Sequence, residues 1–327
     1  MTLNFYIDPD HFPYAYQDDL SFNNKGLLEE LGSANTWLLW TLRTYLELKD
    51  RFTCLLSDTI AAKGITLFFR GSVPLAQKPN REQFWVCMVA DGTWHPYSHI
   101  NIFQNIEGIK KYPQSWFIRH WQQLLIKKST SRNTTPKTIY YFGDVANLAP
   151  ELRSEDWNMF IKENNFEFEI PHFSQWNDYS KIDVVLGIRS FKSGETYPNK
   201  PSSKLINAWR AGVVFIGGED SAYAHERETT YDFIVVKSYG ELKSELVRLK
   251  SSPEEFQKYH TQAVACAGRF PDSFFVDQWV NLVNDMIIPL YAVSPKMGFV
   301  RYCLFISQRF FIYRSEALTL RLKSFSH

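Results

Sequence analysis

The chain has 327 residues, of which 45% are apolar and 16% aromatic, enough to pack the cores of two domains of ordinary size. Charged residues make up 22% and the formal net charge is +1, which argues against a disordered tail protein and against a surface that coats nucleic acid. We therefore expect a globular, soluble protein without a nucleic-acid partner.

The first 130 residues alternate short β-rich runs with helical patterns. Runs that are apolar or β-branched and bounded by turn residues predict strands at 4–7, 52–56, 65–69, 84–89 and 99–103. An amphipathic helix is expected to open at Ser33, with Leu38, Leu42 and Leu46 on its apolar stripe. This alternation is typical of an α/β domain with a mostly parallel sheet.

A linker at 127–137, rich in Ser, Thr and charge, separates this domain from a second one. Beyond it the pattern predicts strands at 138–142, 166–170, 183–188, 213–216 and 233–236, and helices at 151–163, 204–211 and 241–250. Everything after Pro253 is expected to be helical. The prediction is thus two α/β domains, 1–130 and 131–290, and a helical tail at 291–327. Ligands of open parallel sheets bind at the carboxyl ends of the strands, so the predicted site is the cleft between the two sheets.

The segment from Asn199 to Glu226 carries the strongest functional signal. A helix is predicted to begin at Ser202 or Ser203 and to close at Gly212, and the free N–H groups of its first turn would attract a phosphate. Basic residues surround that helix start and could clamp a diphosphate through charge-assisted hydrogen bonds. The candidates are Arg189, Lys192, Lys200, Ser202, Ser203 and Lys204. An ordinary surface helix with a serine cap is the competing interpretation.

The pattern K-P-x-x-K-L-x-N-A-x-x-A-G-V-x-x-I at 200–216, followed by an acidic turn, A-x-x-x-E and D-F-x-x-V, resembles the C-terminal domain of GT-B-fold glycosyltransferases. It looks like bacterial family-1-like or family-4-like sugar transferases. The runs YYFGDVANLAPEL and WNDYSKIDVVLGIR resemble the entry into that domain, and WVCMVADGTWHPYSHINIFQN resembles late strands of the N-terminal domain. The resemblance spans most of residues 35–280.

This resemblance implies the GT-B architecture, in which two Rossmann-like domains face each other across a cleft. It also implies a nucleotide-sugar donor on the second domain, a saccharide or lipid-linked acceptor on the first, no cofactor and no obligatory metal. Ser202, Ser203 and Lys204 match the helix N-terminus that faces the donor phosphates in the family.

Two asparagines depart from the family pattern. Asn207 and Asn199, eight residues earlier, stand where retaining members often carry the two glutamates of an E-x7-E motif. An asparagine can hydrogen-bond a hydroxyl but supplies no carboxylate, so both the retaining assignment and catalysis stay open. Glu219, after two glycines, and Glu226 are acids that could compensate. Glu219 could equally lie at the start of a helix, where the helix dipole favours acids.

Candidates for the acceptor side come from the first domain. Asp91, His95 and His99 lie in the turn DGTWHPYSHI, and an inverting transferase needs a general base there, for which His95 is preferred. A zinc site of the form D-x3-H-x3-H is disfavoured, and histidines that only hydrogen-bond loop backbone are the plain alternative. Further acceptor-side candidates are Arg70 at a strand end and Ser33 and Asn35 before the first long helix; a surface arginine and a helix cap are the simpler interpretations.

Four widely spaced cysteines, without any C-x-x-C pair, favour free thiols in a reducing compartment over a disulfide framework or a zinc ribbon. The first residues lack the regions of a signal peptide, and no apolar run reaches the roughly 18 residues of a membrane-spanning helix. We therefore expect a cytoplasmic protein.

The tail combines basic charge with an apolar helical stripe. Residues 296–327 hold six Lys/Arg and one acid, Glu316. The stripe consists of Phe299, Tyr302, Ile306, Phe310, Tyr313, Ala317 and Leu320. Such a helix can lie on the anionic inner face of the plasma membrane or pack across the first domain. Packing is favoured for 299–306, and both outcomes stay open for the last twenty residues.

The leading hypothesis is therefore a glycosyltransferase of cell-surface polysaccharide or glycolipid synthesis. The main alternative is a catalytically silent GT-B protein that binds a nucleotide sugar or glycan, or that scaffolds a glycan assembly complex. A different two-domain α/β protein is the third possibility.

Overall fold

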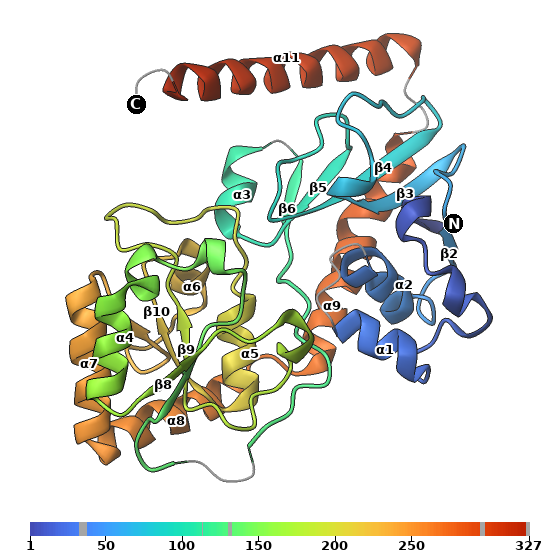
Figure 1. The fold of residues 1–327 in the computed structure, drawn as a ribbon. Helices are drawn as coiled ribbons and strands as arrows, with labels where there is room; N and C mark the ends of the chain where they lie inside the picture. Colours follow the sequence, from blue (N-terminus) through green and yellow to red (C-terminus); the bar gives the residue numbers. More distant parts are fainter. Residues whose placement is uncertain (33–37, 113, 130–132, 295–297, 325–327) are drawn as a thin grey trace.

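Two parallel sheets, one from each half of the chain, frame the structure (Figure 1). The computed structural model describes residues 1–32, 38–112, 114–129, 133–294 and 298–324, with the side chains of 317 and 319–324 left out. Within these ranges the expected α/β class, with two parallel sheets and their surrounding helices, is confirmed. Ser33 and Asn35, and with them the predicted start of the first long helix, lie outside the described residues.

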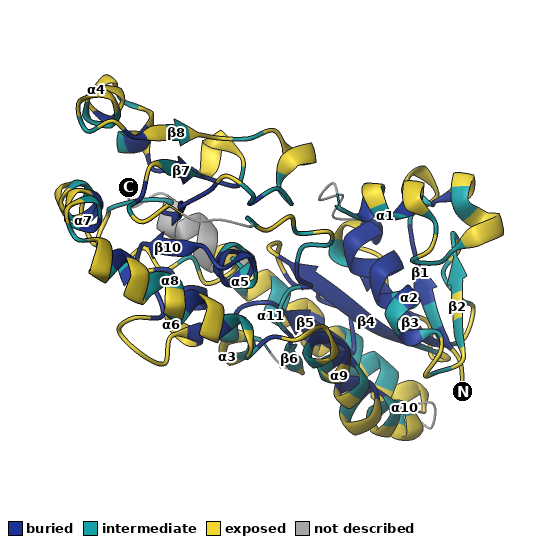
Figure 2. Ribbon diagram, turned by 90° about the horizontal axis from the view of Figure 1, so that it is seen from below, coloured by how far each residue is buried: buried dark blue, intermediate teal, exposed yellow. Residues whose placement is uncertain are grey.

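The first sheet has six parallel strands in the order β2-β1-β3-β4-β5-β6. They are β1 Leu3–Tyr6, β2 Cys54–Ser57, β3 Gly64–Phe69, β4 Gln83–Ala90, β5 Ile100–Phe103 and β6 Ser115–Phe117. Five match the predicted strands to within two residues, but β6 was not expected. The central strands β3 and β4 are buried on both faces, as in parallel sheets covered from both sides (Figure 2).

One face of this sheet is covered by helices from both ends of the chain. Near the start of the chain lie α1 Lys25–Gly32, a π-helical turn at Leu38–Leu42 and α2 Arg43–Leu48. From the second half come α9 Asp272–Leu282 and α10 Ile288–Val293, which cross back onto the first domain (Figure 1). The hydrophobic core on this face is continuous from Leu3 in β1 through Trp121 to Phe215 in the second domain. This shared core holds the two domains together.

The opposite face of the first sheet lacks crossover helices. Residues 70–82 and 91–99, which join β3 to β4 and β4 to β5, contain no α-helix. Only α3 Ile106–Lys111 lies between β5 and β6. The long helix α11 Phe299–Ser324 lies over this face, where Ile312 and Tyr313 pack against buried Trp85 and Trp94 (Figure 1). The tail is therefore helical, as predicted, and its described part packs on the first domain.

The second sheet has five parallel strands in the order β11-β10-β9-β7-β8. They are β7 Thr138–Tyr140, β8 Glu167–Glu169, β9 Val184–Gly187, β10 Val214–Gly217 and β11 Ile234–Val235. Its helices are α4 Glu155–Glu163, α5 Ser203–Ala211, α6 Ser221–Glu226, α7 Tyr239–Ser251 and α8 Pro253–Ala267. Side chains of β9 alternate between a core shared with α4 and α7 and a core shared with α5 and α8, so this sheet is covered on both faces.

Gly187, at the carboxyl end of β9, is required by close packing rather than by backbone conformation. A Cβ atom at this position would lie 2.1 Å from Cζ of the buried Phe215 ring in β10. That separation is far below van der Waals contact, and the ring is held inside the core. The carboxyl end of the sheet therefore tolerates no side chain here.

We predict that Gly187→Ala lowers the free energy of unfolding by about 1–3 kcal/mol, because overpacking forces the ring or the strands apart. Chemical denaturation followed by tryptophan fluorescence measures the loss. The matched control is Gly298→Ala, since a Cβ there meets nothing within 4 Å. Equal stability of the two variants would contradict the close contact.

Candidate functional site

A cavity of about 180 Å³ lies between the two domains at the carboxyl edge of the second sheet. The second domain lines it with Phe142, Gly143, Trp176, Tyr179, Ser203, Lys204 and Asn207, and the first with Leu39, His120, Trp121 and Gln123. A larger hollow of about 910 Å³ lies outside α8, next to Thr134 and Tyr231, at the amino ends of β7 and β11. Ligands of parallel sheets bind at the carboxyl ends, so the interdomain cavity is the candidate site.

Helix α5 points its N-terminus at this cavity. Ser202 occupies the N-cap position, as predicted, but its side chain forms no capping hydrogen bond. Its hydroxyl instead donates to Oε1 of Glu226 over 3.1 Å. The C-cap is Gly212 with φ +68°, in the left-handed conformation expected from the sequence. The Ser202 side chain therefore does not cap the N–H groups of the first turn of α5. Ser203, in the same turn, lines the cavity.

Lys204, one residue further, brings a cation into the cavity. Burial, together with the neighbouring Arg189 guanidinium, holds the pKa of Lys204 well below its usual value. Its ammonium lies 5.1 Å from the centre of the Tyr141 ring, and no ion pair joins it to a carboxylate among the described residues. Gly143, which follows β7, packs closely against the Lys204 side chain: a Cβ at this position would lie 3.1 Å from the ammonium nitrogen. A desolvated cation at a helix N-terminus favours an anionic ligand.

Arg189 lies behind Lys204 and is already paired. Its Nε is 3.3 Å from Oδ2 of Asp220, and both side chains are almost fully buried. Asp220 caps α6 by accepting a hydrogen bond from the N–H of Ala222 over 3.1 Å. Burial raises the pKa of Asp220 to about 6, although Arg189 opposes this effect. The pair joins the carboxyl ends of β9 and β10, so Arg189 shapes the site next to Lys204.

Several residues predicted to bind the donor instead connect the two domains. The ammonium of Lys200 is 2.7 Å from Oδ2 of Asp91, and Nδ2 of Asn199 donates to the Asp91 carbonyl over 2.9 Å. Oδ1 of Asn207 accepts from the N–H of Gln123 over 3.0 Å. Although burial of Asp91 opposes it, the hydrogen bond from Lys200 holds the Asp91 pKa below its usual value.

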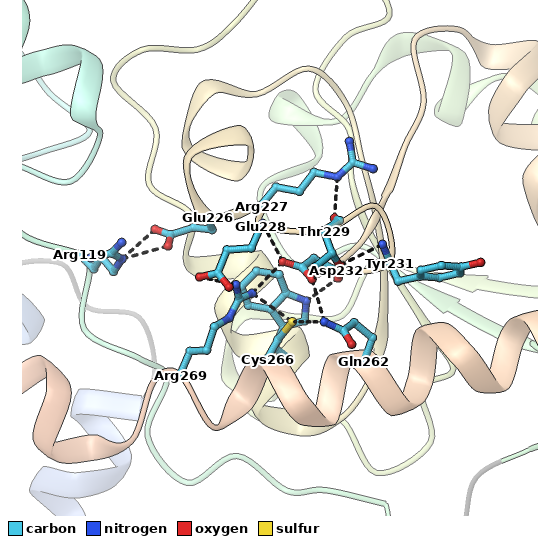
Figure 3. A network of polar contacts seen from close by, with 11 residues as sticks. Arg119, Glu226, Arg227, Glu228, Thr229, Tyr231, Asp232, Gln262, Cys266 and Arg269 are labelled. Carbon is cyan, nitrogen blue, oxygen red and sulfur yellow. Dashed lines mark hydrogen bonds and ion pairs between the residues drawn. The ribbon is translucent and has the colours of Figure 1, made fainter.

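Glu226 forms the most buried of these connections. Nε of Arg119, from the first domain, donates to both carboxylate oxygens of Glu226 at 2.9 and 3.0 Å (Figure 3). Only 2% of the Glu226 side chain is exposed, against 20% of Arg119. The carboxylate is therefore shared between Arg119 and Ser202 at the start of α5. This contact fixes the helix start against the first domain.

His120 is a residue of the cavity that the sequence interpretation missed. Nδ1 of its ring lies 2.6 Å from the Trp121 carbonyl, and burial lowers its pKa to about 4. The ring is therefore neutral near pH 7, with Nδ1–H donating to the carbonyl and Nε2 left as an acceptor. His120 follows β6 by three residues, at the carboxyl edge of the first sheet. Had β6 been recognised in the sequence, His120 would have been a candidate as a polar residue just beyond a strand end.

The structure does not bring the other predicted residues to the cavity. His95 bonds the Pro74 carbonyl through Nε2 over 3.1 Å, and His99 stacks on Phe84 and on Phe305 of α11. Burial lowers the pKa of His95 to about 4 and that of His99 to about 3. Three further predicted residues also lie away from the cavity. Arg70 at the end of β3 bonds the Val73 carbonyl, Glu219 pairs with Lys237 on the surface, and Lys192 is exposed.

A polar network around Asp232 anchors the loop that follows α6 (Figure 3). The buried carboxylate accepts hydrogen bonds from the Thr229 hydroxyl at 2.6 Å and the Glu228 N–H at 2.9 Å. Gln262 and Arg269, on the α8 side, complete its partners at 2.9 and 3.0 Å. Burial opposes ionisation, but these bonds outweigh it and hold the Asp232 pKa at about 2. The network fixes the segment that carries Glu226.

We predict that Asp232 makes the protein acid-sensitive. Its pKa is depressed in the folded state. Its contribution to the free energy of unfolding is therefore complete above about pH 4 and is lost as the pH falls toward 2. The lowered pKa of Asp232 corresponds to a contribution of about 2 kcal/mol to the free energy of unfolding. Urea denaturation of wild type and Asp232→Asn at pH 5 and pH 2.5 measures this, with the exposed Asp277→Asn as control. An unchanged acid sensitivity in Asp232→Asn would contradict the assignment.

No family model matches the sequence, and no curated protein matches it. Among solved structures, TarM aligns with a TM-score of 0.50 and 11% identity over 75% of this chain and 58% of TarM. HepE of Anabaena, solved with UDP and glucose, aligns with a TM-score of 0.46 and 10% identity over 88% of this chain and 100% of HepE. AviGT4, a glycosyltransferase involved in avilamycin A biosynthesis, aligns with a TM-score of 0.42 and 10% identity over 86% of this chain and 98% of AviGT4. The chain spans less than two thirds of the length of TarM. The likeness to TarM establishes the fold: the two facing domains have the GT-B architecture of glycosyltransferases, as the sequence resemblance implied.

Proposed function

We propose that the chain is a glycosyltransferase that takes a nucleotide-sugar donor into the interdomain cavity. The observation that carries the proposal is the side-chain amino group of Lys204, which lines the cavity at the N-terminus of α5 without a carboxylate partner among the described residues. The cavity lies at the carboxyl edge of a parallel sheet, where such folds bind their ligands. A diphosphate would match both the ammonium and the N–H groups of the first helical turn.

In this mechanism, catalysis comes from position and charge. As the bond between the sugar and the diphosphate breaks, Lys204 and the N-terminus of α5 stabilise the charge that develops on the leaving oxygen. We propose that this cationic end makes a metal or other cofactor unnecessary. The neutral His120, facing the cavity from the first domain, would hydrogen-bond the transferred sugar through Nε2. Of the three predicted catalytic residues, Asp91 is the one that contacts the second domain across the cleft, so it is the remaining candidate base.

The acceptor in this proposal is a saccharide or a lipid-linked saccharide of the cell surface, glycosylated on the cytoplasmic side. A second candidate function is a silent GT-B protein that binds a nucleotide sugar without transferring it. The contacts of Asn199 and Asn207 favour that alternative, because both side chains connect the domains and neither supplies a carboxylate.

A thermal-shift screen with UDP-, GDP- and dTDP-sugars tests the donor site, followed by hydrolysis and transfer assays with the donor that binds. A ligand at about a hundred times its dissociation constant stabilises the fold by about 2.7 kcal/mol, a readily measured shift. Absence of a shift with every nucleotide would overturn the proposal. If a nucleotide sugar binds but is neither hydrolysed by water nor transferred to a membrane-lipid acceptor, the result would support the catalytically silent GT-B protein instead.

A further inference from the structure

Helix α11 is apolar on two opposite faces. Its inner face packs on the first domain: the Tyr302 hydroxyl donates to the Pro79 carbonyl over 2.9 Å, and Phe305 stacks on His99. Further along, the carboxylate of Glu316 accepts hydrogen bonds from Trp94 and Tyr112 at 2.8 and 2.6 Å. These contacts fix which face of α11 is turned outward.

The outer face carries large apolar side chains that nothing covers within the described chain. Val300, Leu304, Phe311 and Leu318 are 60–70% exposed. On a helix of about 3.6 residues per turn they fall within about 40° of one another, opposite the residues that pack inward. Among the described residues, five of the six most exposed large apolar side chains lie in α11, the sixth being Val293. A contiguous stripe of this kind marks a surface that is covered in use.

The charges beside this stripe identify its partner. The exposed Arg301 and Arg314 flank it on opposite sides of the helix, and the exposed Lys78 and Arg81 lie on the adjoining loop. The acid Glu316 is turned inward and paired with Lys111 over 2.7 Å. A second copy packed on the stripe would bring like charges together, whereas an anionic lipid surface complements them.

We propose that the outer face of α11 is a docking surface for an anionic lipid bilayer, on which the helix lies flat. No helix in the described part of the chain is long and apolar enough to cross a membrane, and a flat orientation needs none to do so. This inference goes beyond the donor site, because it depends on α11 and not on whether the cleft binds a nucleotide.

A second cavity lies between the inner face of α11 and the domain junction. It measures about 520 Å³ and is lined by Trp94, Tyr112 and Tyr313 next to α11 and by Asp91 and Asn199 at the domain junction. A bilayer on the outer face of α11 would thus lie one helix away from an aromatic-lined cavity that includes Asp91. That arrangement suits an acceptor whose apolar part remains in the membrane while its sugar reaches the cleft.

Vesicle co-sedimentation of the full chain tests the proposal. We expect binding on the order of tenfold stronger to vesicles with about 30% phosphatidylglycerol than to pure phosphatidylcholine, because arginines beside the stripe add attraction to anionic headgroups. Leu304→Glu/Phe311→Glu should lose that binding on the order of tenfold, and Arg301→Gln/Arg314→Gln should lose the preference for the anionic vesicles. Since the four side chains are exposed, the melting temperature should stay unchanged, which shows that the variants fold.

The matched control is Met159→Glu/Val264→Glu, which places the same charges on exposed apolar positions of α4 and α8. The proposal is overturned if wild type remains in the supernatant with both vesicle types, or if the control loses binding as much as the α11 variant. It is also overturned if light scattering shows a dimer that Leu304→Glu/Phe311→Glu converts to a monomer, since a second copy would then cover the stripe. A nucleotide thermal shift on the same samples without vesicles reports separately on the donor site.

Discussion

Replacing Lys204 with methionine is expected to weaken nucleoside diphosphate binding on the order of ten- to a hundredfold without destabilising the fold. A hydrogen bond to a charged group contributes about 1.5–3 kcal/mol, and the buried ammonium has no carboxylate partner among the described residues that would take over. Methionine keeps most of the side-chain volume and removes a desolvated charge, so the free protein should be at least as stable. Calorimetric titration and denaturation together measure both effects.

The pH dependence of the same titration makes this prediction specific. Burial depresses the pKa of Lys204, so the protein without a bound ligand should lose this charge at a lower pH than an ordinary lysine would. An anionic ligand binds the protonated form better, so wild-type affinity should fall as the pH rises, and this dependence should be absent in Lys204→Met. The control is the exposed Lys192→Met from the preceding loop. An affinity as low in Lys192→Met as in Lys204→Met would contradict a specific role for Lys204.

The fold was largely predictable because each domain repeats a local signal. Short apolar strands such as 184–187 alternate with amphipathic helices, and each of these patterns is readable within a few residues. The strand β6, Ser115–Phe117, escaped prediction because only three apolar residues in a row, 116–118, mark it. The strands β7, β8 and β11 are as short, but they lie within longer β-type runs of four or five residues. The loss of β6 also hid His120, which is recognisable only as a polar residue just beyond a strand end. A local omission thus removed a residue of the candidate site.

The sequence predicts those residues of the candidate site that a single helix or strand places. It does not predict contacts between residues of two distant elements. Ser203 and Lys204 line the cavity because they open α5, which the sequence shows directly. The partners of Asn207 and Glu226 are Gln123 and Arg119, 84 and 107 residues away, and no local pattern reveals such pairs. Residue type alone also pointed to His95, whose surroundings in the structure are the rings of Phe68 and Trp85.

Glu226→Gln is expected to lower the free energy of unfolding by about 3 kcal/mol, because it leaves the Arg119 guanidinium facing a neutral amide at a buried contact. A ribose-binding glutamate would behave differently: its loss would weaken nucleotide binding and leave stability almost unchanged. Denaturation and nucleotide titration of the same variant separate the two roles. The matched control is Glu167→Gln, whose partner Lys137 lies 2.8 Å away in an exposed pair. Because solvent screens an exposed pair, this variant should leave the free energy of unfolding almost unchanged.

A double-mutant cycle with Arg119→Met decides whether the loss comes from the contact between the domains. If the two side chains stabilise the protein through each other, Arg119→Met/Glu226→Gln should be less destabilised than the sum of the single variants, by about 1–3 kcal/mol. Strictly additive losses would mean that Glu226 acts through Ser202 and the start of α5 instead. A coupled pair would place Glu226 in the closure of the two domains. Lys204 would then be the basic residue of the predicted clamp that lines the cavity without a carboxylate partner among the described residues.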